Sequence, residues 1–222
     1  MGLDLLQTNL PYGLLRRCGK LLACLLILAP GLVAADTVKL VALGDSLVAG
    51  YGLPEEEGFV PQLDAWLAAQ GRPEVEVINM GVSGDTTAGG LARLDWALGG
   101  GADAVLVELG ANDLLRGVDP AASRANLDQL LSKLHDRNLP VLISGMTASN
   151  NFGPEYKADY DAMFPDLAEK HGALYDPFFL EGLVGEPGLF QSDGLHPNRE
   201  GVARIVARIG PRIIELLDRV EE

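Results

Sequence analysis

The stretch VKLVALGDSL at residues 38–47 places six mostly apolar residues directly before a glycine turn. A short apolar run that ends at a glycine such as Gly44 is typical of a strand buried on both faces. Strands of this kind occur in parallel sheets, because helices cover both sides of such a sheet. We therefore interpret residues 38–43 as the first strand of an α/β protein, and Gly44 as the start of the loop that follows it.

Outward from this strand, the chain alternates between short apolar runs and longer segments with apolar side chains at helical spacing. Four further strands are predicted at residues 75–78, 104–109, 141–144 and 173–175. Helices are predicted at residues 59–69, 87–98, 120–137, 154–170 and 199–219, with Pro211 as a candidate kink in the last. Regular alternation of strand and helix predicts one domain with a parallel sheet and helices on both faces.

Residues 1–35 have the layout of a secretory signal peptide. Three basic residues precede an apolar run at residues 21–35, and the small residues before Asp36 suit a signal peptidase. The run is short for a membrane span, which disfavours an uncleaved anchor. It also mostly follows Cys24, which disfavours lipoprotein processing at that residue. We therefore expect a mature domain at residues 36–222 that is periplasmic or secreted and has no stable membrane span.

The composition excludes several classes of function. The whole chain has a formal net charge of −14. Residues 1–35 carry one acidic and three basic side chains, so 30 acidic and 14 basic side chains remain in the expected mature part, a net charge of −16. Such a field repels nucleic acids, and we expect no nucleic-acid partner. Both cysteines lie in residues 1–35, so the mature part has no thiolate or disulfide, and its few histidines give a metal site little support.

Four segments, three at predicted carboxyl ends of strands and one before the last helix, combine glycine with small polar residues. They are GDSL at 44–47, GVSGDTT at 81–87, GAND at 110–113 and DGLHPN at 193–198. Binding sites of open α/β sheets lie at the carboxyl ends of the strands. We therefore expect the functional site to lie among these segments.

The side chains in these segments include every part that acyl transfer needs. The Ser46 hydroxyl is a poor nucleophile until a base removes its proton, and the imidazole of His196 can do so near neutral pH. Asp193, three residues earlier, is close enough to hold the imidazole in the required tautomer. The backbone N–H groups of Ser46 and Gly84 and the side-chain amide of Asn112 are suitable donors to an oxyanion.

Each segment also has a simpler interpretation. Asp45 or Ser46 can cap a following helix, residues 112–113 form a common turn sequence, and an Asp-x-x-His pair is often surface decoration. The joint occurrence of all four segments, in chain order and at strand ends, favours the catalytic interpretation.

Three further residues stand outside this pattern. Glu108 interrupts an apolar strand, and we expect a buried, hydrogen-bonded structural carboxylate, with tuning of the site as the alternative. His135 is expected on the polar side of a helix, and His171 at a helix C-terminus, where a cation is favourable. We assign neither histidine a functional role.

Taken together, the four segments resemble the sequence blocks of the SGNH (GDSL) hydrolase superfamily. The chain is more similar still to its bacterial periplasmic branch of multifunctional thioesterases, lysophospholipases and proteases, often called arylesterases. GLARL at residues 90–94 and the stretch at residues 107–113 extend the resemblance, which covers nearly all of the expected mature part. Residues 146–156 (MTASNNFGPEY) depart from the substrate-side loop of that branch.

The resemblance implies a three-layer α/β/α sandwich with a five-stranded parallel sheet. It implies Ser46 as nucleophile, His196 as general base and acid, and Asp193 as the residue that orients it. The implied oxyanion hole consists of Ser46, Gly84 and Asn112, and no metal or organic cofactor is implied. The implied reaction is hydrolysis of aryl esters, lysophospholipids or fatty acyl thioesters through an acyl-serine intermediate.

Two alternatives remain open at this point. One is a carbohydrate O-acetyl esterase of the same superfamily, and the other is a non-catalytic envelope binding protein. In each case we expect a monomer.

Overall fold

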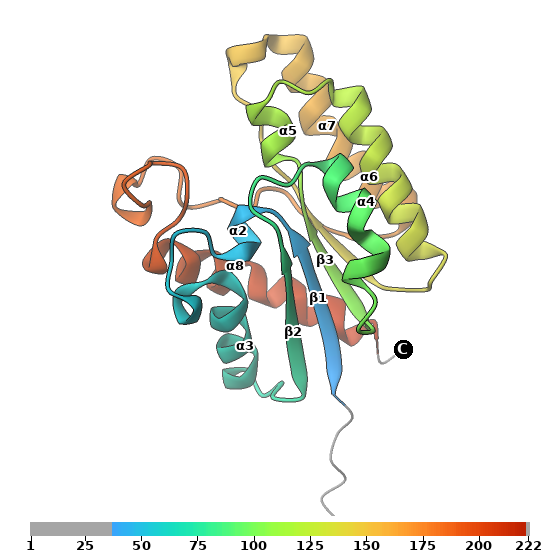
Figure 1. Ribbon diagram of the computed structural model, residues 1–222, viewed down its shortest axis with the longest axis vertical. Coiled ribbons are helices and arrows are strands. Elements are labelled where there is room, and N and C mark those ends of the chain that lie inside the picture. Colours follow the sequence, from blue (N-terminus) through green and yellow to red (C-terminus); the bar gives the residue numbers. More distant parts are fainter. Residues whose placement is uncertain (1–36, 221–222) are drawn as a thin grey trace, which may run out of the picture. The chain divides into compact units, whose positions relative to one another are not determined.

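The computed structural model describes residues 37–220, which form a five-stranded parallel sheet between layers of helices (Figure 1). The strand order is β2-β1-β3-β4-β5. The strands are β1 (Val38–Gly44), β2 (Val75–Gly81), β3 (Ala104–Glu108), β4 (Val141–Ser144) and β5 (Leu174–Asp176). All five predicted strands are present, and each pairs in parallel with its neighbours. β2 continues beyond its predicted end at residue 78, because its pairing with β1 extends to Gly81.

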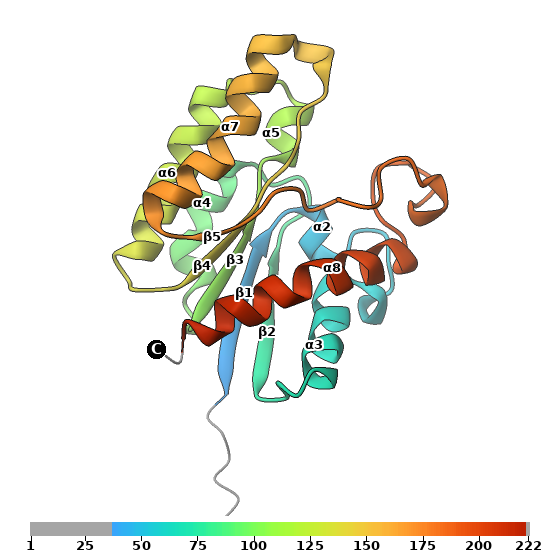
Figure 2. The ribbon, with the colours of Figure 1, turned by 180° about the vertical axis from the view of Figure 1, so that it is seen from behind.

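Within residues 37–220, two long helices cover one face of the sheet and three cover the other (Figures 1 and 2). α3 (Phe59–Ala69) packs against α8 (Arg199–Asp218) on the first face. α4 (Thr87–Ala97), α6 (Pro120–His135) and α7 (Pro154–His171) lie on the second. The predicted three-layer α/β/α sandwich is therefore confirmed.

The core lies on both faces of the sheet, which explains why the strands read as continuous apolar runs. Residues 40–43 of β1 and 104–107 of β3 have no exposed surface. The apolar stripe predicted for the last helix is buried as well, and α8 continues past Pro211. Complete burial of one such Leu, Ile or Val side chain contributes about 1.5–3 kcal/mol.

The carboxyl ends of β1, β2 and β3 lie at the same level of the sheet. Gly44 of β1 is paired with Gly81 of β2 and with Glu108 of β3. Close packing requires both glycines: a Cβ atom at Gly44 would lie 2.4 Å from Val48 Cγ2, and one at Gly81 would lie 2.2 Å from the backbone N of Ala49. The residues that follow β1 therefore pack directly against the carboxyl ends of the strands.

Short helices follow β1 and β3; the capping interpretation of residues 45–46 allowed for the first, whereas the sequence pattern indicated no helix after β3. They are α2 (Ser46–Ala49) and α5 (Ala111–Leu115). Each is about one turn long, too short to show a helical repeat of apolar residues. The candidate residues Ser46 and Asn112 therefore lie at helix starts rather than in open loops. Single 3₁₀ turns lie at Glu55–Glu57, Asn150–Phe152 and Pro187–Leu189.

The predicted signal peptide at residues 1–35 and its expected cleavage before Asp36 lie outside the described residues. Both cysteines lie outside them too. Across residues 37–220, no helix combines the length and the apolar character that a membrane crossing requires.

Candidate active site

Ser46 lies where β1 ends, on a sharp turn into α2. The buried side chain of Asp45 caps this helix, because its Oδ1 accepts a hydrogen bond from the N–H of Leu47 at 2.9 Å. The capping interpretation of this segment is thus correct for Asp45. Because Asp45 provides the cap, the Ser46 hydroxyl is available for another contact. Its Oγ lies 2.9 Å from Nε2 of His196.

His196 lies in the loop that precedes α8, beside Asp193. Its Nδ1 lies 2.7 Å from Asp193 Oδ2. The other carboxylate oxygen accepts the backbone N–H groups of Leu195 (2.9 Å) and of His196 itself (3.0 Å). The hydrogen bond from the His196 side chain, followed by these two backbone hydrogen bonds, lowers the pKa of Asp193 to about 2. Asp193 therefore stays ionised at neutral and moderately acidic pH.

The Asp193 carboxylate selects one tautomer of the imidazole. An ionised carboxylate only accepts hydrogen bonds, so the ring hydrogen of neutral His196 must sit on Nδ1. Nε2 then presents its lone pair to the Ser46 hydroxyl, which donates to it. Tyr51 packs against the same imidazole, with 4.6 Å between the ring centroids. The structure thus brings the three predicted catalytic side chains into one chain of hydrogen bonds.

Asn112 reaches the same site from α5, which starts just after β3. The turn into α5 depends on Gly110, whose φ of 124° suits glycine and whose Cβ would lie 3.0 Å from the Tyr160 hydroxyl. Nδ2 of Asn112 donates to Asp45 Oδ2 at 2.9 Å. This contact uses one of the two amide hydrogens and leaves the other for a further acceptor.

Gly84 lies in the loop after β2, in the left-handed conformation with φ of 84°. Its carbonyl accepts a hydrogen bond from Nη2 of Arg116 at 2.7 Å, which ties this loop to the end of α5. Across the described part of the chain, the backbone N–H groups of Gly84 and Ser46 donate to no protein acceptor. Both therefore remain available to a substrate oxygen.

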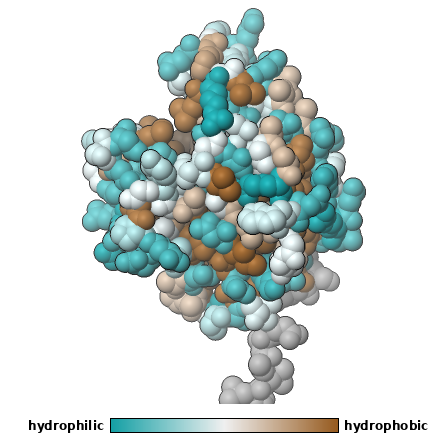
Figure 3. All heavy atoms as spheres, in the orientation of Figure 1, coloured by the Kyte–Doolittle hydropathy of each residue, from teal (hydrophilic) through white to brown (hydrophobic). Residues whose placement is uncertain are grey.

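An apolar pocket of about 180 Å³ opens beside these groups. Ser46, Asn112 and His196 line it together, whereas Gly84 and Asp193 do not. The other lining residues come from α2, α5 and the loops beside them at this end of the sheet, and are Asp45, Leu47, Ala111, Leu114, Leu115, Met146, Thr147, Phe178, Leu180 and Leu195. On the molecular surface, apolar residues flank the notch between α5 and the segment that joins β5 to α8 (Figure 3).

Asp113, which sequence interpretation did not single out, anchors α5 to the helical layer. Its buried carboxylate accepts hydrogen bonds from the N–H (2.8 Å) and hydroxyl (2.6 Å) of Thr87 and from the hydroxyl of Ser123 (2.8 Å). These contacts join α5 to α4 and α6. In the sequence, Asp113 is visible only as a charged residue beside Asn112. A charged residue at this place is equally typical of an exposed turn, so it does not indicate a buried anchor.

Gln191 is a second residue that sequence interpretation missed. Its Nε2 donates to the carbonyls of Tyr51 (2.8 Å) and Pro197 (3.0 Å), and its backbone N–H donates to the carbonyl of His196 (2.8 Å). It therefore ties the loop after α2 to the loop that carries the imidazole. No motif marks this residue in the sequence.

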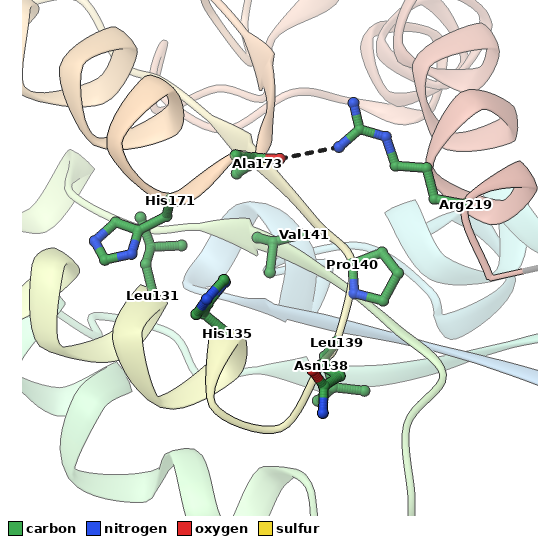
Figure 4. A pocket seen from close by; sticks show the side chains of 10 residues that line it. Leu131, His135, Asn138, Leu139, Pro140, Val141, His171, Ala173 and Arg219 are labelled. Carbon is green, nitrogen blue, oxygen red and sulfur yellow. Dashed lines mark hydrogen bonds between the residues drawn. The ribbon is translucent and has the colours of Figure 1, made fainter. Parts of the chain in front are cut away.

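A larger pocket, of about 390 Å³, lies at the opposite, amino-terminal end of the strands (Figure 4). His135 and His171, the last residues of α6 and α7, line it. Nε2 of His171 lies 2.6 Å from Asp128 Oδ1, and Arg219 donates to the carbonyl of Gly172 at 3.0 Å. The predicted place of His171 at a helix C-terminus is confirmed, and both histidines lie far along the sheet from the candidate catalytic residues.

Within residues 37–220, no three His, Cys, Asp or Glu side chains are grouped as a metal site would require. The candidate site instead offers a hydroxyl, an imidazole and several N–H donors. This is the set of groups that acyl transfer to serine uses.

Comparison with known proteins agrees with this chemistry. Residues 42–204 match the GDSL-like lipase/acylhydrolase family. The chain is 38% identical over 193 residues to esterase TesA of Pseudomonas aeruginosa, covering 86% of this chain and 94% of that protein. It is 38% identical over 169 residues to thioesterase 1/protease 1/lysophospholipase L1 of Escherichia coli K12, covering 75% and 78% respectively.

Among solved structures, the chain is similar to the psychrotrophic esterase EstA from Pseudoalteromonas sp., inhibited by monoethylphosphonate. The TM-score is 0.76 at 34% sequence identity, covering 81% of this chain and 98% of that one. The family match, the relatives and the shared fold agree with one another. The chain therefore belongs to the GDSL-like lipase/acylhydrolase family and is an esterase of the SGNH hydrolase type.

Proposed function

We propose that this esterase hydrolyses acyl esters and thioesters through an acyl-enzyme formed on Ser46. The observation that carries the proposal is the chain of hydrogen bonds from Asp193 through His196 to Ser46, at 2.7 and 2.9 Å, beside an apolar pocket. An imidazole held by a carboxylate removes the serine proton as attack proceeds, and this overcomes the weakness of a free hydroxyl as a nucleophile.

Each half of the reaction uses the imidazole twice. In acylation, Nε2 of His196 takes the hydroxyl proton while Oγ of Ser46 forms a bond to the carbonyl carbon. The imidazolium, stabilised by Asp193, then gives this proton to the leaving alcohol or thiol as the old bond breaks. In deacylation a water molecule takes the place of the serine hydroxyl, and the carboxylic acid leaves.

The tetrahedral intermediate carries a negative charge on the former carbonyl oxygen. We assign its stabilisation to the backbone N–H groups of Ser46 and Gly84 and to the second amide hydrogen of Asn112. The support is that neither backbone N–H has another acceptor in the described residues, and that Asn112 lines the same pocket as Ser46. Donors of this kind act most strongly when the charge develops.

The pocket favours substrates with an apolar acyl chain. Beyond the reacting groups its wall consists mainly of Leu, Met and Phe side chains. Covering methylene groups there contributes about 0.8 kcal/mol for each CH₂. We therefore assign fatty acyl esters, lysophospholipids, aryl esters and acyl thioesters as the substrate class, and the names of the esterase and thioesterase/lysophospholipase relatives support this range.

The main test is the Ser46→Ala variant, assayed on a short p-nitrophenyl ester and on an acyl thioester. We expect kcat to fall by at least about 10³-fold, because no nucleophile remains to form the acyl-enzyme. Ser132→Ala is the matched control, since Ser132 is exposed on α6, and we expect it to retain full activity. Undiminished turnover of both substrates by Ser46→Ala would overturn the proposal.

Turnover measured against acyl-chain length separates this function from its two rivals. We expect rates to increase with chain length until the pocket is filled. Hydrolysis of acetylated sugars, without hydrolysis of longer acyl chains, would identify a carbohydrate O-acetyl esterase. Failure of a fluorophosphonate probe to label folded protein would identify a non-catalytic binding protein.

We also infer that residues 1–35 direct export and that the active form begins at Asp36. The support is the order of basic residues, apolar run and small residues before that position. Sequencing the N-terminus of the exported protein tests this, with a start at Asp36 expected and a membrane-bound form that keeps residues 1–35 contradicting it. Light scattering of the same material tests the expected monomer.

A further inference from the structure

Glu108 is a buried carboxyl group at the turn that carries Ser46. It is the last residue of β3, in register with Gly44 of β1, and it has no exposed surface. Its Oε2 accepts a long hydrogen bond of 3.4 Å from the N–H of Asp45, and within residues 37–220 its Oε1 has no partner. An ionised carboxylate with so few hydrogen bonds is strongly unfavourable in such surroundings.

Asp45 is a second carboxyl group at the same place, and it too has no exposed surface. Unlike Glu108, it is well supplied with donors: the N–H of Leu47 to Oδ1 and Nδ2 of Asn112 to Oδ2, each at 2.9 Å. Two adjacent buried carboxyl groups repel one another strongly if both are ionised. The negative charge therefore resides on Asp45, which has the better hydrogen bonds, and the proton resides on Glu108.

The electrostatics of the pair agree with this distribution. Burial, and then the charge of Asp45, raise the pKa of Glu108 well above its usual range. Burial also raises the pKa of Asp45, but hydrogen bonds from Leu47, Glu108 and Asn112 oppose that rise.

Three other ionisable groups near the pair make hydrogen bonds to other partners, although Nη1 of Arg93 has no partner within residues 37–220. Arg93 of α4 donates from Nη2 to a backbone carbonyl at the end of β1 at 2.9 Å, and from Nε to Asp85 at 2.6 Å. The hydroxyl of Tyr160 on α7 donates to the carbonyl of the residue that starts the turn into α5, at 2.8 Å. His196 faces Asp45 and makes its own contacts with the catalytic serine and Asp193. None of them forms an ion pair with Glu108.

We propose that Glu108 is a positioning residue that acts as a neutral carboxylic acid: it holds the backbone of Asp45 through the N–H of that residue, so that the Asp45 carboxylate aims the amide of Asn112 at the reacting oxygen. The inference rests on the proposed role of Asn112 as an oxyanion donor. One amide hydrogen of Asn112 is bound to Asp45, so the direction of the other hydrogen follows from where Asp45 lies. A small displacement of Asp45 therefore misdirects a donor whose effect depends on its placement.

Substitutions of Glu108 separate its charge from its shape. Glu108→Gln keeps the size, the neutral state and an oxygen that can accept the N–H of Asp45, and we expect kcat within about threefold of the parent. Glu108→Leu removes the polar contact at similar volume, and we expect kcat to fall about 10–100-fold with KM within about twofold, since the misdirected donor acts in the transition state. A loss in Glu108→Gln as large as in Glu108→Leu overturns the proposal.

A double-mutant cycle with Asn112→Ala tests the route through the amide. If Glu108 acts through Asn112, Glu108→Leu costs no more than about twofold in kcat when the amide is already absent. A full, multiplicative loss in the double variant overturns the positioning role. It leaves the acyl hydrolase function intact, because that function depends on the separate result for Ser46→Ala.

The pH profile provides a readout that does not require the Leu variant to fold. In the parent, kcat is expected to fall at alkaline pH as Glu108 ionises and repels Asp45, and this limb is expected to be absent in Glu108→Gln. The free energy of unfolding is expected to change in the same direction as kcat. A carboxyl group whose pKa is raised in the folded state stabilises the fold at low pH, and this contribution is lost as the pH rises towards the raised pKa. Identical kcat profiles in parent and Glu108→Gln overturn the proposal.

Discussion

Two histidine–aspartate pairs lie at opposite ends of the sheet. At the carboxyl end, Nδ1 of His196 lies 2.7 Å from Asp193, and at the amino end, Nε2 of His171 lies 2.6 Å from Asp128. By distance the two pairs are alike. They differ in the second ring nitrogen, which meets the Ser46 hydroxyl at 2.9 Å in His196 but has no partner within the described residues in His171.

The two carboxylates differ as well. Both oxygens of Asp128 lie 2.7 Å from Nζ of Lys170, and hydrogen bonds from Lys170 and then His171 lower the pKa of Asp128. Within residues 37–220, Asp193 accepts hydrogen bonds from two backbone N–H groups and from the imidazole, and it has no ammonium or guanidinium partner. A carboxylate already neutralised by an ammonium group stabilises an imidazolium less. A short distance between a histidine and an aspartate therefore does not by itself mark a candidate catalytic pair: His196 also has a hydroxyl partner, and Asp193 has no ammonium partner within the described residues.

Removal of each imidazole is expected to give the largest contrast between the two ends. His196→Ala should lower kcat by at least about 10³-fold, because the general base is lost. His171→Ala should leave kcat within about twofold. Hydrolysis of a p-nitrophenyl ester measures both, and a comparable loss in the two variants would contradict the assignment of catalysis to the carboxyl end.

Replacement of the aspartate in each pair tests the same difference between the two ends of the sheet. Here the altered residue does not contact the nucleophile itself. Asp193→Asn should lower kcat by about 10²–10⁴-fold, because an amide can donate to Nδ1 and favour the wrong tautomer of His196. Asp128→Asn should leave kcat unchanged and lower the free energy of unfolding by no more than about 1 kcal/mol, since the charged partner of Asp128, Lys170, is more than half exposed. Steady-state kinetics and urea unfolding provide these values, and full activity of Asp193→Asn would remove the distinction.

The ring of Tyr51 adds a smaller difference, because it packs on His196. Tyr51→Ala should lower kcat about 2–5-fold, since an aromatic face beside an imidazolium contributes about 0.5–1 kcal/mol at an exposed site. Tyr51→Phe keeps the ring and should behave like the parent. Trp96→Ala is the matched control, as Trp96 is also exposed but lies on α4. Equal losses in Tyr51→Phe and Tyr51→Ala would assign the effect to the hydroxyl.

The smallest expected effect is the acid dependence of stability at Asp193. Its pKa is lowered from 3.8 to about 2 in the folded protein. A carboxyl group of this kind stabilises the fold above its ordinary pKa, and the contribution disappears as the pH falls towards the lowered value. Urea unfolding of parent and Asp193→Asn should therefore differ by a constant amount near neutral pH and converge towards pH 2. A difference that vanished at higher pH would show a weaker contact with the imidazole.

The strands and long helices were predictable because burial on two faces and helical spacing leave strong patterns over many residues. α2 and α5 were not, since one turn contains too few residues to show a period. His196 and Ser46 are far apart in the sequence. The order of the motifs suggested that they meet, and the distance between them became known only from the structure. Asp113 and Gln191 act through backbone groups and neighbouring helices, so their importance appears only once those partners are in place. The fold and the family are confirmed, whereas the catalytic roles remain predictions.

The origin of the residues that line the apolar pocket bears on how the acyl preference of this esterase can evolve. Met146, Phe178 and Leu180 contribute to the wall from the segments that follow β4 and β5. The rest of the wall comes from the same segments as Ser46, Asn112 and His196, so only the residues at 146–147 and 178–180 line the pocket from segments without a candidate catalytic residue. Selection, in nature or in the laboratory, can therefore change the shape of the pocket at these two segments while the segments that carry Ser46, Asn112 and His196 keep their sequence.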